Sequence, residues 1–261
     1  MLIAAAVLSA VAIGSWWLER VAFTPSNDSN VAYSILGDEE IRGQVATVVA
    51  GATAPTLQQS AAQLREEIER IARIPDGAAL MRDIVDGAHS RLIGDSDERV
   101  VITAQEQVNI VRNELVGDQA PLTLPVQRVG SVAFVDDWIG WAALSLFGLG
   151  VLAALVGLAM RPERGEGTYA LGVFFGSLAA SMAILGYIVP LLVLPALADD
   201  PWMGVFSRLA NHQRNLTLAT AGVAAVIAVL IVGRSGARND RRQHSTPLNV
   251  GRYRDDRSWS R

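Results

Sequence analysis

The sequence contains no cysteine and no lysine, and only three of its 261 residues are histidine. Without cysteine there can be no disulfide bond, thiolate metal site or cysteine nucleophile, so packing alone must hold the fold together. The histidines, His89, His212 and His244, fall in three separate segments. Catalytic signatures such as H-E-x-x-H, G-x-S-x-G, a Walker loop or a strand-linked G-x-G-x-x-G are also missing. We therefore predict a protein that is not an enzyme and that uses no metal or cofactor and no nucleic acid.

Charge is absent from four stretches of 17, 23, 30 and 19 residues, namely 2–18, 138–160, 169–198 and 215–233. An α-helix rises about 1.5 Å per residue and needs roughly 20 apolar residues to cross the hydrocarbon core. The sequence therefore predicts a mainly α-helical integral membrane protein with four transmembrane helices. A mostly helical extracytoplasmic domain with a small β element is expected between the first two helices. The expected parts are a signal anchor (1–19), the extracytoplasmic domain (20–137), a three-helix region (138–233) and an Arg-rich tail (234–261).

The first apolar stretch has two interpretations, an uncleaved signal anchor or a cleaved secretory signal. Ala10-Val11-Ala12 matches the small-x-small pattern of a cleavage site, but it lies inside the apolar run and "IGSWWLE" still follows. Signal cleavage sites lie after the apolar region, and a basic flank normally precedes it. We favour an uncleaved anchor, with Trp16 and Trp17 at the membrane interface.

The distribution of arginine predicts the orientation of the chain in the membrane. Residues 234–261 contain eight Arg and three Asp, whereas residues 20–137 contain ten Arg and eighteen acidic residues. Positively charged segments remain in the cytoplasm. Both termini and the 161–167 turn are therefore expected in the cytoplasm of a bacterial inner membrane protein, and residues 20–137 and 199–212 outside it.

Within residues 20–137 the apolar spacing predicts several helices. The clearest is expected over 56–74, beginning at a Thr56–Gln59 capping box and ending before Pro75. A second helix is expected over 76–93, followed by Gly94, and a weaker one over 38–50. Val100–Ile102 is expected to be a short strand, with a Thr103–Glu106 capping box opening the helix after it. The segment 121–135 is β-like but interrupted by proline. His89 is expected on the exposed side of its helix.

Two pairs of acids flank the apolar runs. The orientation above places Asp136, Asp137, Asp199, Asp200 and His212 together at the outer membrane surface. Such a cluster could bind a divalent metal or act on a lipid headgroup. The simpler interpretation is a membrane boundary, because these acids stay hydrated at helix ends and Trp138, Trp141 and Trp202 anchor the interface. For Asp136 and Asp137 we also expect stabilisation by a helix N-terminus. We favour the boundary and keep the site as the alternative.

The apolar runs contain no ionisable residue that would indicate an ion or proton path. They do contain a stripe of small residues, Gly172, Gly176 and Ala180, which predicts close approach of another helix from the same chain or from another subunit. Pro190 and Pro195 are expected to kink or end the third helix.

The tail is too polar to fold by itself. Its proximal arginines suit anionic lipids. Tyr253 and Trp259 lie far along it, and aromatic residues among arginines suit docking on a cytoplasmic protein.

With this layout assembled, the chain resembles actinobacterial four-helix inner-membrane proteins that carry an outer helical domain and an Arg-rich tail. The phrases "SILGDEEIRGQV", "VDDWIGW" and "ALADDPW" carry the resemblance. Within that class it is similar to LucB-like accessory subunits of mycobacterial Mce-type lipid importers. The resemblance implies a scaffold subunit of an envelope complex that transports lipid, with other membrane proteins and membrane lipids as partners. Two alternatives remain: a membrane enzyme acting on a lipid-linked substrate through the outer acids, and an envelope signalling or stress sensor.

Overall fold

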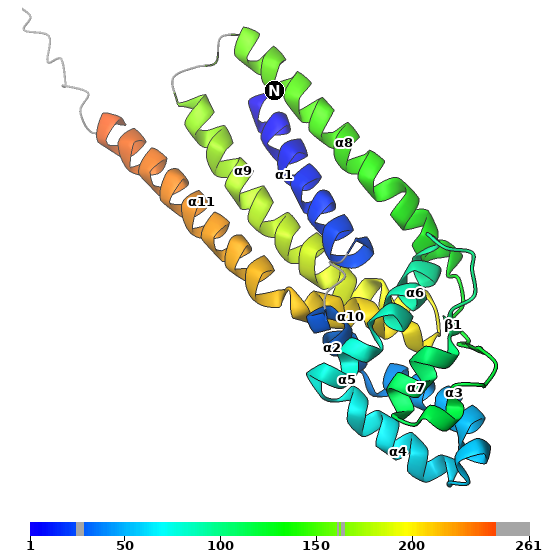
Figure 1. Ribbon diagram of the computed structural model, residues 1–261. Helices are drawn as coiled ribbons and strands as arrows, with labels where there is room; N and C mark the ends of the chain where they lie inside the picture. The colour runs from blue at the N-terminus through cyan, green and yellow to red at the C-terminus, as the bar shows by residue number, and fades with distance from the viewer. Residues whose placement is uncertain (25–28, 161, 163–164, 244–261) are drawn as a thin grey trace, which may run out of the picture.

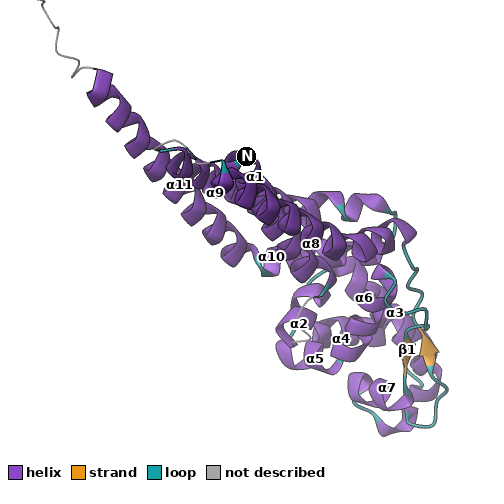
Figure 2. Ribbon diagram, turned by 90° about the horizontal axis from the view of Figure 1, so that it is seen from above, coloured by secondary structure: helices purple, strands orange, loops and turns teal. Residues whose placement is uncertain are grey.

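The structure is a computed structural model that describes residues 1–24, 29–160, 162 and 165–243, with side chains as far as Arg234. It is mainly helical, with an elongated bundle at one end and a domain of shorter helices at the other (Figures 1 and 2). Four helices are long and apolar enough to cross a membrane, as predicted: Leu2–Phe23, Gly130–Ala159, Glu166–Val193 and Arg214–Arg234.

The four long helices form one layer in the order α8, α1, α9, α11 (Figure 1). Their bounds are α1 (Leu2–Leu18), extended by the π-helical η1 (Glu19–Phe23), α8 (Gly130–Ala159), α9 (Glu166–Ala183) and α11 (Arg214–Gln243). The chain's N-terminus, the start of α9 and the end of α11 lie at the end of the bundle away from the domain (Figure 1). This is the arrangement that four consecutive crossings produce.

The helices of the layer pack through small residues. A Cβ atom added to Gly150 of α8 would lie 2.6 Å from Ser9 Oγ of α1, and one added to Gly14 of α1 would lie 2.7 Å from Ser181 Cβ of α9. The Ser181 hydroxyl donates a hydrogen bond to the Ala10 carbonyl across the same contact, at 3.0 Å. Small residues and hydroxyl groups of this kind let membrane helices approach closely. Helix α1 thus lies between α8 and α9 and packs against both.

Helix α9 continues into η3 (Ile184–Val193), a π-helical stretch that contains the buried Pro190. Proline has no N–H for the regular ladder, so a wider turn around it is expected. The chain then passes through η4 (Pro195–Leu197), where Pro195 takes the first position, and η5 (Pro201–Met203) into α10 (Gly204–His212). The predicted end of the third helix near these prolines is thus confirmed.

Among its described residues, the domain contains six helices, a 3-10 turn and a two-stranded sheet. These are α2 (Ser29–Leu36), α3 (Glu39–Leu57), α4 (Ala61–Ala72), α5 (Pro75–Leu80), α6 (Arg82–Ile93), β1 (Val101–Ile102), α7 (Ala104–Val111), η2 (Glu114–Val116) and β2 (Leu122–Thr123). The strands are antiparallel, with Val101 opposite Thr123. The predicted helical content and small β element are confirmed, including a capping box in which Thr103 and Glu106 satisfy each other's backbone N–H groups.

Three predicted helices differ from the structure, namely the end of the one expected over 38–50, the start of the one over 56–74 and the continuity of the one over 76–93. Helix α3 runs through Pro55 to Leu57 and ends where Gln58 adopts φ 54°, so Thr56 does not open a helix and α4 begins only at Ala61. The extension persists because Thr53 and Ala54 are buried, and this packing outweighs the local effect of proline. The helix expected over 76–93 is divided at the fully buried Met81 into α5 and α6.

The domain does not have a core of its own. One continuous apolar core includes Phe23 from the end of α1, residues of α2, α3 and α6, and Trp202, Phe206 and Leu209 from the segment between the last two membrane helices. Trp202 and Phe206 are completely buried, and the Phe206 ring lies 6.0 Å from that of Phe23. The bundle and the domain are therefore joined by large buried side chains rather than by a flexible linker.

Candidate functional site

The first acid pair does not lie at a helix N-terminus. Helix α8 begins at Gly130, so Asp136 and Asp137 occupy its second turn, and the predicted stabilisation by the helix end is wrong. The residues that looked β-like extend the helix because Val132 and Ala133 are buried against the domain. A Cβ atom on Gly94, which ends α6 with φ 95°, would lie 2.7 Å from Ala133 Cβ.

The half-buried Asp136 carboxyl has three acidic neighbours, namely Asp95 from the segment after α6, Asp137 and Glu19. The first turns of α8 therefore lie beside the domain.

The second acid pair lies in a different place. Asp199 and Asp200 line a groove of about 1250 Å³ together with the start of α3, including Asp38 and Glu40. Asp200 accepts a hydrogen bond from the Trp202 backbone N–H at 2.8 Å and thereby caps η5. This cap positions the tryptophan that fills the shared core.

Across the same groove, Asp38 accepts a hydrogen bond from Arg208 Nε of α10 at 3.2 Å. The groove is therefore closed on one side by an ion pair between the domain and the segment that links the membrane helices.

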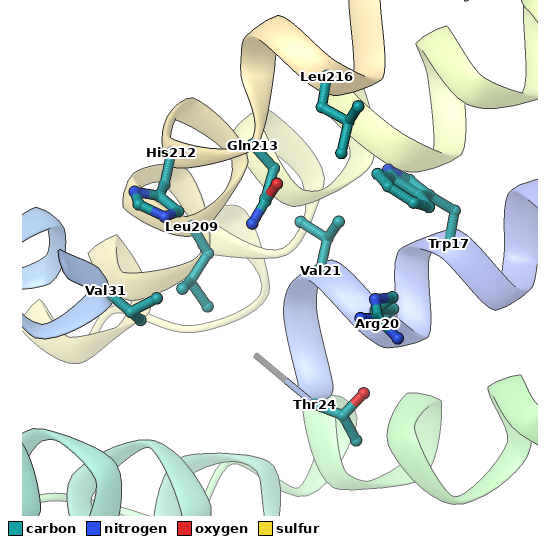
Figure 3. Close-up of a pocket in the computed structure, with 9 residues that line it drawn as sticks. All are labelled: Trp17, Arg20, Val21, Thr24, Val31, Leu209, His212, Gln213 and Leu216. Atoms are coloured by element: carbon teal, nitrogen blue, oxygen red, sulfur yellow. The ribbon is translucent and has the colours of Figure 1, made fainter. Parts of the chain in front are cut away.

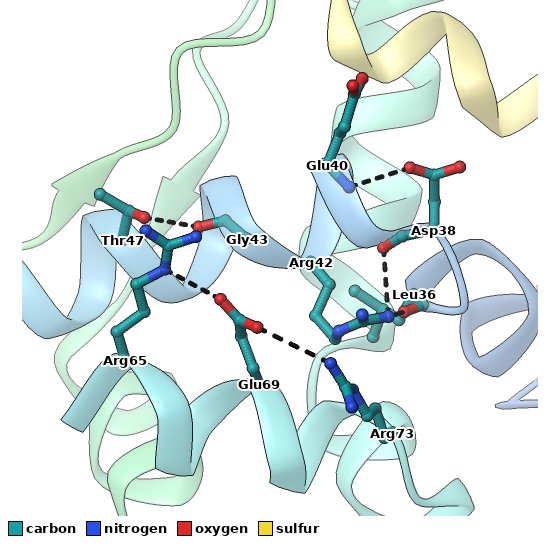
Figure 4. Close-up of polar contacts among 9 residues, drawn as sticks. All are labelled: Leu36, Asp38, Glu40, Arg42, Gly43, Thr47, Arg65, Glu69 and Arg73. Atoms are coloured by element: carbon teal, nitrogen blue, oxygen red, sulfur yellow. Dashed lines mark hydrogen bonds and ion pairs between the residues drawn. The ribbon is translucent and has the colours of Figure 1, made fainter. Parts of the chain in front are cut away.

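Arg42 is a buried cation that sequence reasoning missed. Its Nη1 donates to the carbonyl oxygens of Leu36, at 2.8 Å, and Asp38, at 3.3 Å, which fixes the turn between α2 and α3 (Figure 4). The Asp38 side chain in turn accepts from the Glu40 N–H at 3.1 Å and caps α3. These contacts form a structural network around the turn. The neighbouring Arg65, Glu69 and Arg73 make exposed ion pairs, which stabilise little.

His89 is not a surface residue, so this prediction is wrong. Only 4% of it is exposed, its Nε2 donates to the Ala22 carbonyl at 2.9 Å, and its ring meets that of Phe206 edge-on at 6.1 Å. Burial lowers the pKa of His89, partly opposed by the hydrogen bond to Ala22 and by Asp86 and Asp95. His89 is covered by Ala22 of η1 and Phe206 of α10, whose approach the sequence did not reveal.

The acids and His212 do not form one site. His212 lies in a third place, a pocket between the end of α1 and the start of α11. Among the residues the structure describes, no group of three or more histidine and acidic side chains could hold a metal ion. These residues all lie toward the domain end of the bundle, but they lie in separate places and do not form the predicted cluster.

Two further predictions concern interaction surfaces. A Cβ atom on Gly172 would lie 2.9 Å from Val232 Cγ2, and one on Gly176 would lie 3.9 Å from Ala228 Cβ, so both glycines face α11 of the same chain. Ala180 of the same stripe is exposed. Tyr253 and Trp259 of the tail lie outside the described residues.

Two cavities adjoin the domain end of the bundle. The first, of about 280 Å³, is lined by Trp17, Arg20, Val21, Thr24, Val31, Leu209, His212, Gln213 and Leu216 (Figure 3). The second is an apolar cleft of about 390 Å³ between α1 and α8, lined by Ala12, Ile13, Trp16, Glu19, Gly140, Ala143, Leu144 and Phe147. Sequence reasoning found neither, although the apolar spacing of Val205, Phe206, Leu209 and Ala210 could have identified α10 as a packed helix.

The comparisons with known proteins give no family for this chain. No protein-family model, no curated protein sequence and no solved structure matches it. Its function must therefore be argued from the arrangement of its own residues.

Proposed function

We propose that this protein is a non-enzymatic scaffold or accessory subunit of a bacterial envelope membrane complex, and that the complex transports lipid. The observation that carries the proposal is the open layer of four apolar helices. In a closed four-helix bundle every helix packs against two neighbours, whereas here α8 packs mainly against α1 and α11 mainly against α9, at opposite edges of one layer (Figure 1). Each edge offers a whole helix to a neighbouring membrane protein.

The α8 edge is the better candidate for a protein contact. Phe134, Trp138 and Trp141 follow one another at helical spacing, and each is at least 60% exposed. Aromatic residues of this kind both anchor a helix at the membrane interface and serve as the main contacts in protein interfaces. Further along, the row continues with the exposed Leu144 and Leu152.

The shared core supports a scaffold role. Because Trp202 and Phe206 belong to the membrane-helix connection and also fill the domain core, the domain cannot move far without disturbing the bundle. A partner bound to the domain is therefore held at a fixed position relative to one bound to the bundle.

The lipid part of the proposal has two supports. One is the resemblance to accessory subunits of Mce-type importers. The other is the cleft between α1 and α8, whose Trp16, Leu144 and Phe147 walls suit an acyl chain. The alternative of a membrane enzyme relied on an acidic cluster, and its members lie apart, so we do not pursue it. The sensor alternative relied on the tail, in which α11 continues as far as Gln243 and residues 244–261 lie outside the described residues.

Purification of the tagged full-length protein in mild detergent, followed by mass spectrometry, tests the proposal. We expect other membrane proteins in fixed ratio, and we expect Leu152→Trp on the α8 edge to reduce their recovery. Val226→Trp, at an equally exposed position on the α11 edge, is the comparison and should reduce their recovery less. Recovery of the protein alone, from cells in which it is functional, would contradict the proposal.

A further inference from the structure

The smaller of the two cavities has the composition of an anion site. It lies between the end of α1, the end of α10 and the start of α11 (Figure 3). Arg20 and His212 bring cationic or donor groups to it, and Gln213 and Thr24 add an amide and a hydroxyl. Arginine, imidazole and amide N–H groups are donors that suit phosphate oxygens.

No carboxylate is among the described residues that line this pocket. The nearest acid in sequence, Glu19, points to the other side of α1, where its Oε1 lies 3.2 Å from the position of a Cβ atom on Gly140 of α8. No ion pair of Arg20 occurs among the described residues, and its guanidinium lies 6.0 Å from the centre of the Trp16 ring.

The pocket is held in shape by contacts that do not use the side chains of Arg20, His212 or Gln213. Trp17 Nε1 donates to Thr217 Oγ1 at 3.0 Å, which fixes the end of α1 against the start of α11. Asn211 accepts from the Tyr187 hydroxyl at 3.4 Å on the neighbouring η3. The pocket residues Arg20, His212 and Gln213 are thus carried by helices that are already positioned.

Size and surroundings indicate what kind of anion fits. A cavity of about 280 Å³ is below the roughly 300–1,000 Å³ of pockets that enclose a whole small molecule. It suits a headgroup whose remainder lies outside. Leu216 and Val21 form its apolar walls, and Leu216 is 55% exposed at the start of a membrane helix, where acyl chains would continue.

We propose that this pocket binds a phosphate group, carried by the headgroup of an anionic phospholipid, through Arg20, His212 and Gln213. The proposal requires only that the four helices lie in a bilayer, and it does not depend on membership of a larger complex. A free phosphate compound offers the same chemistry without the acyl chains, so the experiment separates the two sources.

The test uses the full-length protein in mild detergent, titrated with phosphatidylglycerol, with diacylglycerol of the same chains, or with inorganic phosphate. Binding is followed by hydrogen exchange of residues 17–24 and 209–216. We expect phosphatidylglycerol to protect these segments and diacylglycerol not to. Arg20→Gln with His212→Gln should weaken phosphatidylglycerol binding about tenfold or more, because charge-assisted hydrogen bonds are lost. Arg99→Gln, at an exposed position of the domain, is the control that should bind normally.

Unchanged thermal unfolding of the double variant would show that it is folded, since both replaced side chains are exposed. Equal protection by inorganic phosphate and phosphatidylglycerol would support the phosphate site and assign it to a soluble ligand. Equal protection by diacylglycerol and phosphatidylglycerol, or normal phosphatidylglycerol binding by the double variant, would overturn the proposal.

Discussion

The membrane bundle packs through small residues, whereas the domain packs through large ones. In the bundle the contacts are made by Gly14, Gly150, Gly172 and Ser181, while large residues such as Phe147 and Leu155 point outward. In the domain the contacts are made by large side chains, among them Trp202 and Phe206, and the outward surface is charged.

The difference follows from the surroundings of each region. In water, burying a large apolar side chain gains about 25 cal/mol for each Å² removed from solvent, so large residues belong inside. In a bilayer the lipid tails are as apolar as leucine, and helices gain instead from close approach of their backbones. The segment 194–209 belongs to both regions, because it connects two membrane helices and completes the domain core.

The largest expected effect is in the shared core. Phe206→Ala removes a fully buried ring that contacts Phe23 and His89, and it should destabilise the fold by about 3–5 kcal/mol. Thermal unfolding in mild detergent measures this. Phe147→Ala, at a position 52% exposed on α8, is the matched change in the bundle and should shift stability much less. Equal effects of the two changes would remove the contrast between the regions.

The stability of the bundle should depend more on enlarging its small contact residues than on truncating its large outward side chains. Gly150→Leu places a side chain where Ser9 and the α1 backbone leave no room, and overpacking of this kind costs about 1–3 kcal/mol. Gly148→Leu, two residues earlier on the same helix, has nothing within 4 Å of its added Cβ atom. We expect the first change to lower the unfolding temperature in detergent and the second to leave it unchanged. A similar loss for both would show that glycine matters there only for backbone flexibility.

The domain should also weaken in mild acid through His89. Its folded pKa is lowered by burial, so the unfolded chain takes up a proton at a pH where the folded protein does not. Stability is therefore full above an unfolded pKa of about 6.5 and falls below it, by at most about 1.4 kcal/mol per pH unit for one group. Unfolding free energies between pH 7 and pH 5 should fall less steeply in His89→Gln. Parallel curves for the variant and the parent protein would exclude His89 as a cause.

The smallest predicted change is at the surface of the domain. Thr103→Ala removes the hydroxyl that accepts from the Glu106 N–H and should destabilise the fold by about 1 kcal/mol. Thr103→Ser keeps the hydroxyl and should restore most of the loss in the same unfolding measurement. If the alanine and serine variants unfold alike, the capping box contributes nothing measurable.

These expectations also mark what the sequence could predict. The four apolar runs, the Thr103–Glu106 box and the αL end at Gly94 depend on local composition and spacing, and the structure has all three. The extension of α8 back to Gly130 and the passage of α3 through Pro55 depend on burial against distant residues. Local propensity cannot predict such effects.

The candidate sites show the same limit. His89 and Arg42 are polar residues whose partners, Ala22 and Leu36, are backbone carbonyls brought near by packing. Nothing in the pattern of the side chains identifies such a partner in advance. The pocket that holds Arg20 and His212 joins residues nearly two hundred positions apart, and it exists only because α1 lies beside α9 and close to α11.

The central claim is that the open edges of the helix layer receive other proteins. The most direct measurement places a photo-crosslinking amino acid at Leu152 on α8 or at Val226 on α11 and irradiates native membranes. Both positions are more than 55% exposed. We predict discrete protein adducts from at least one edge, strongest from α8. Adducts with lipid alone from both positions would contradict the claim, because the layer would then be surrounded by bilayer on every side.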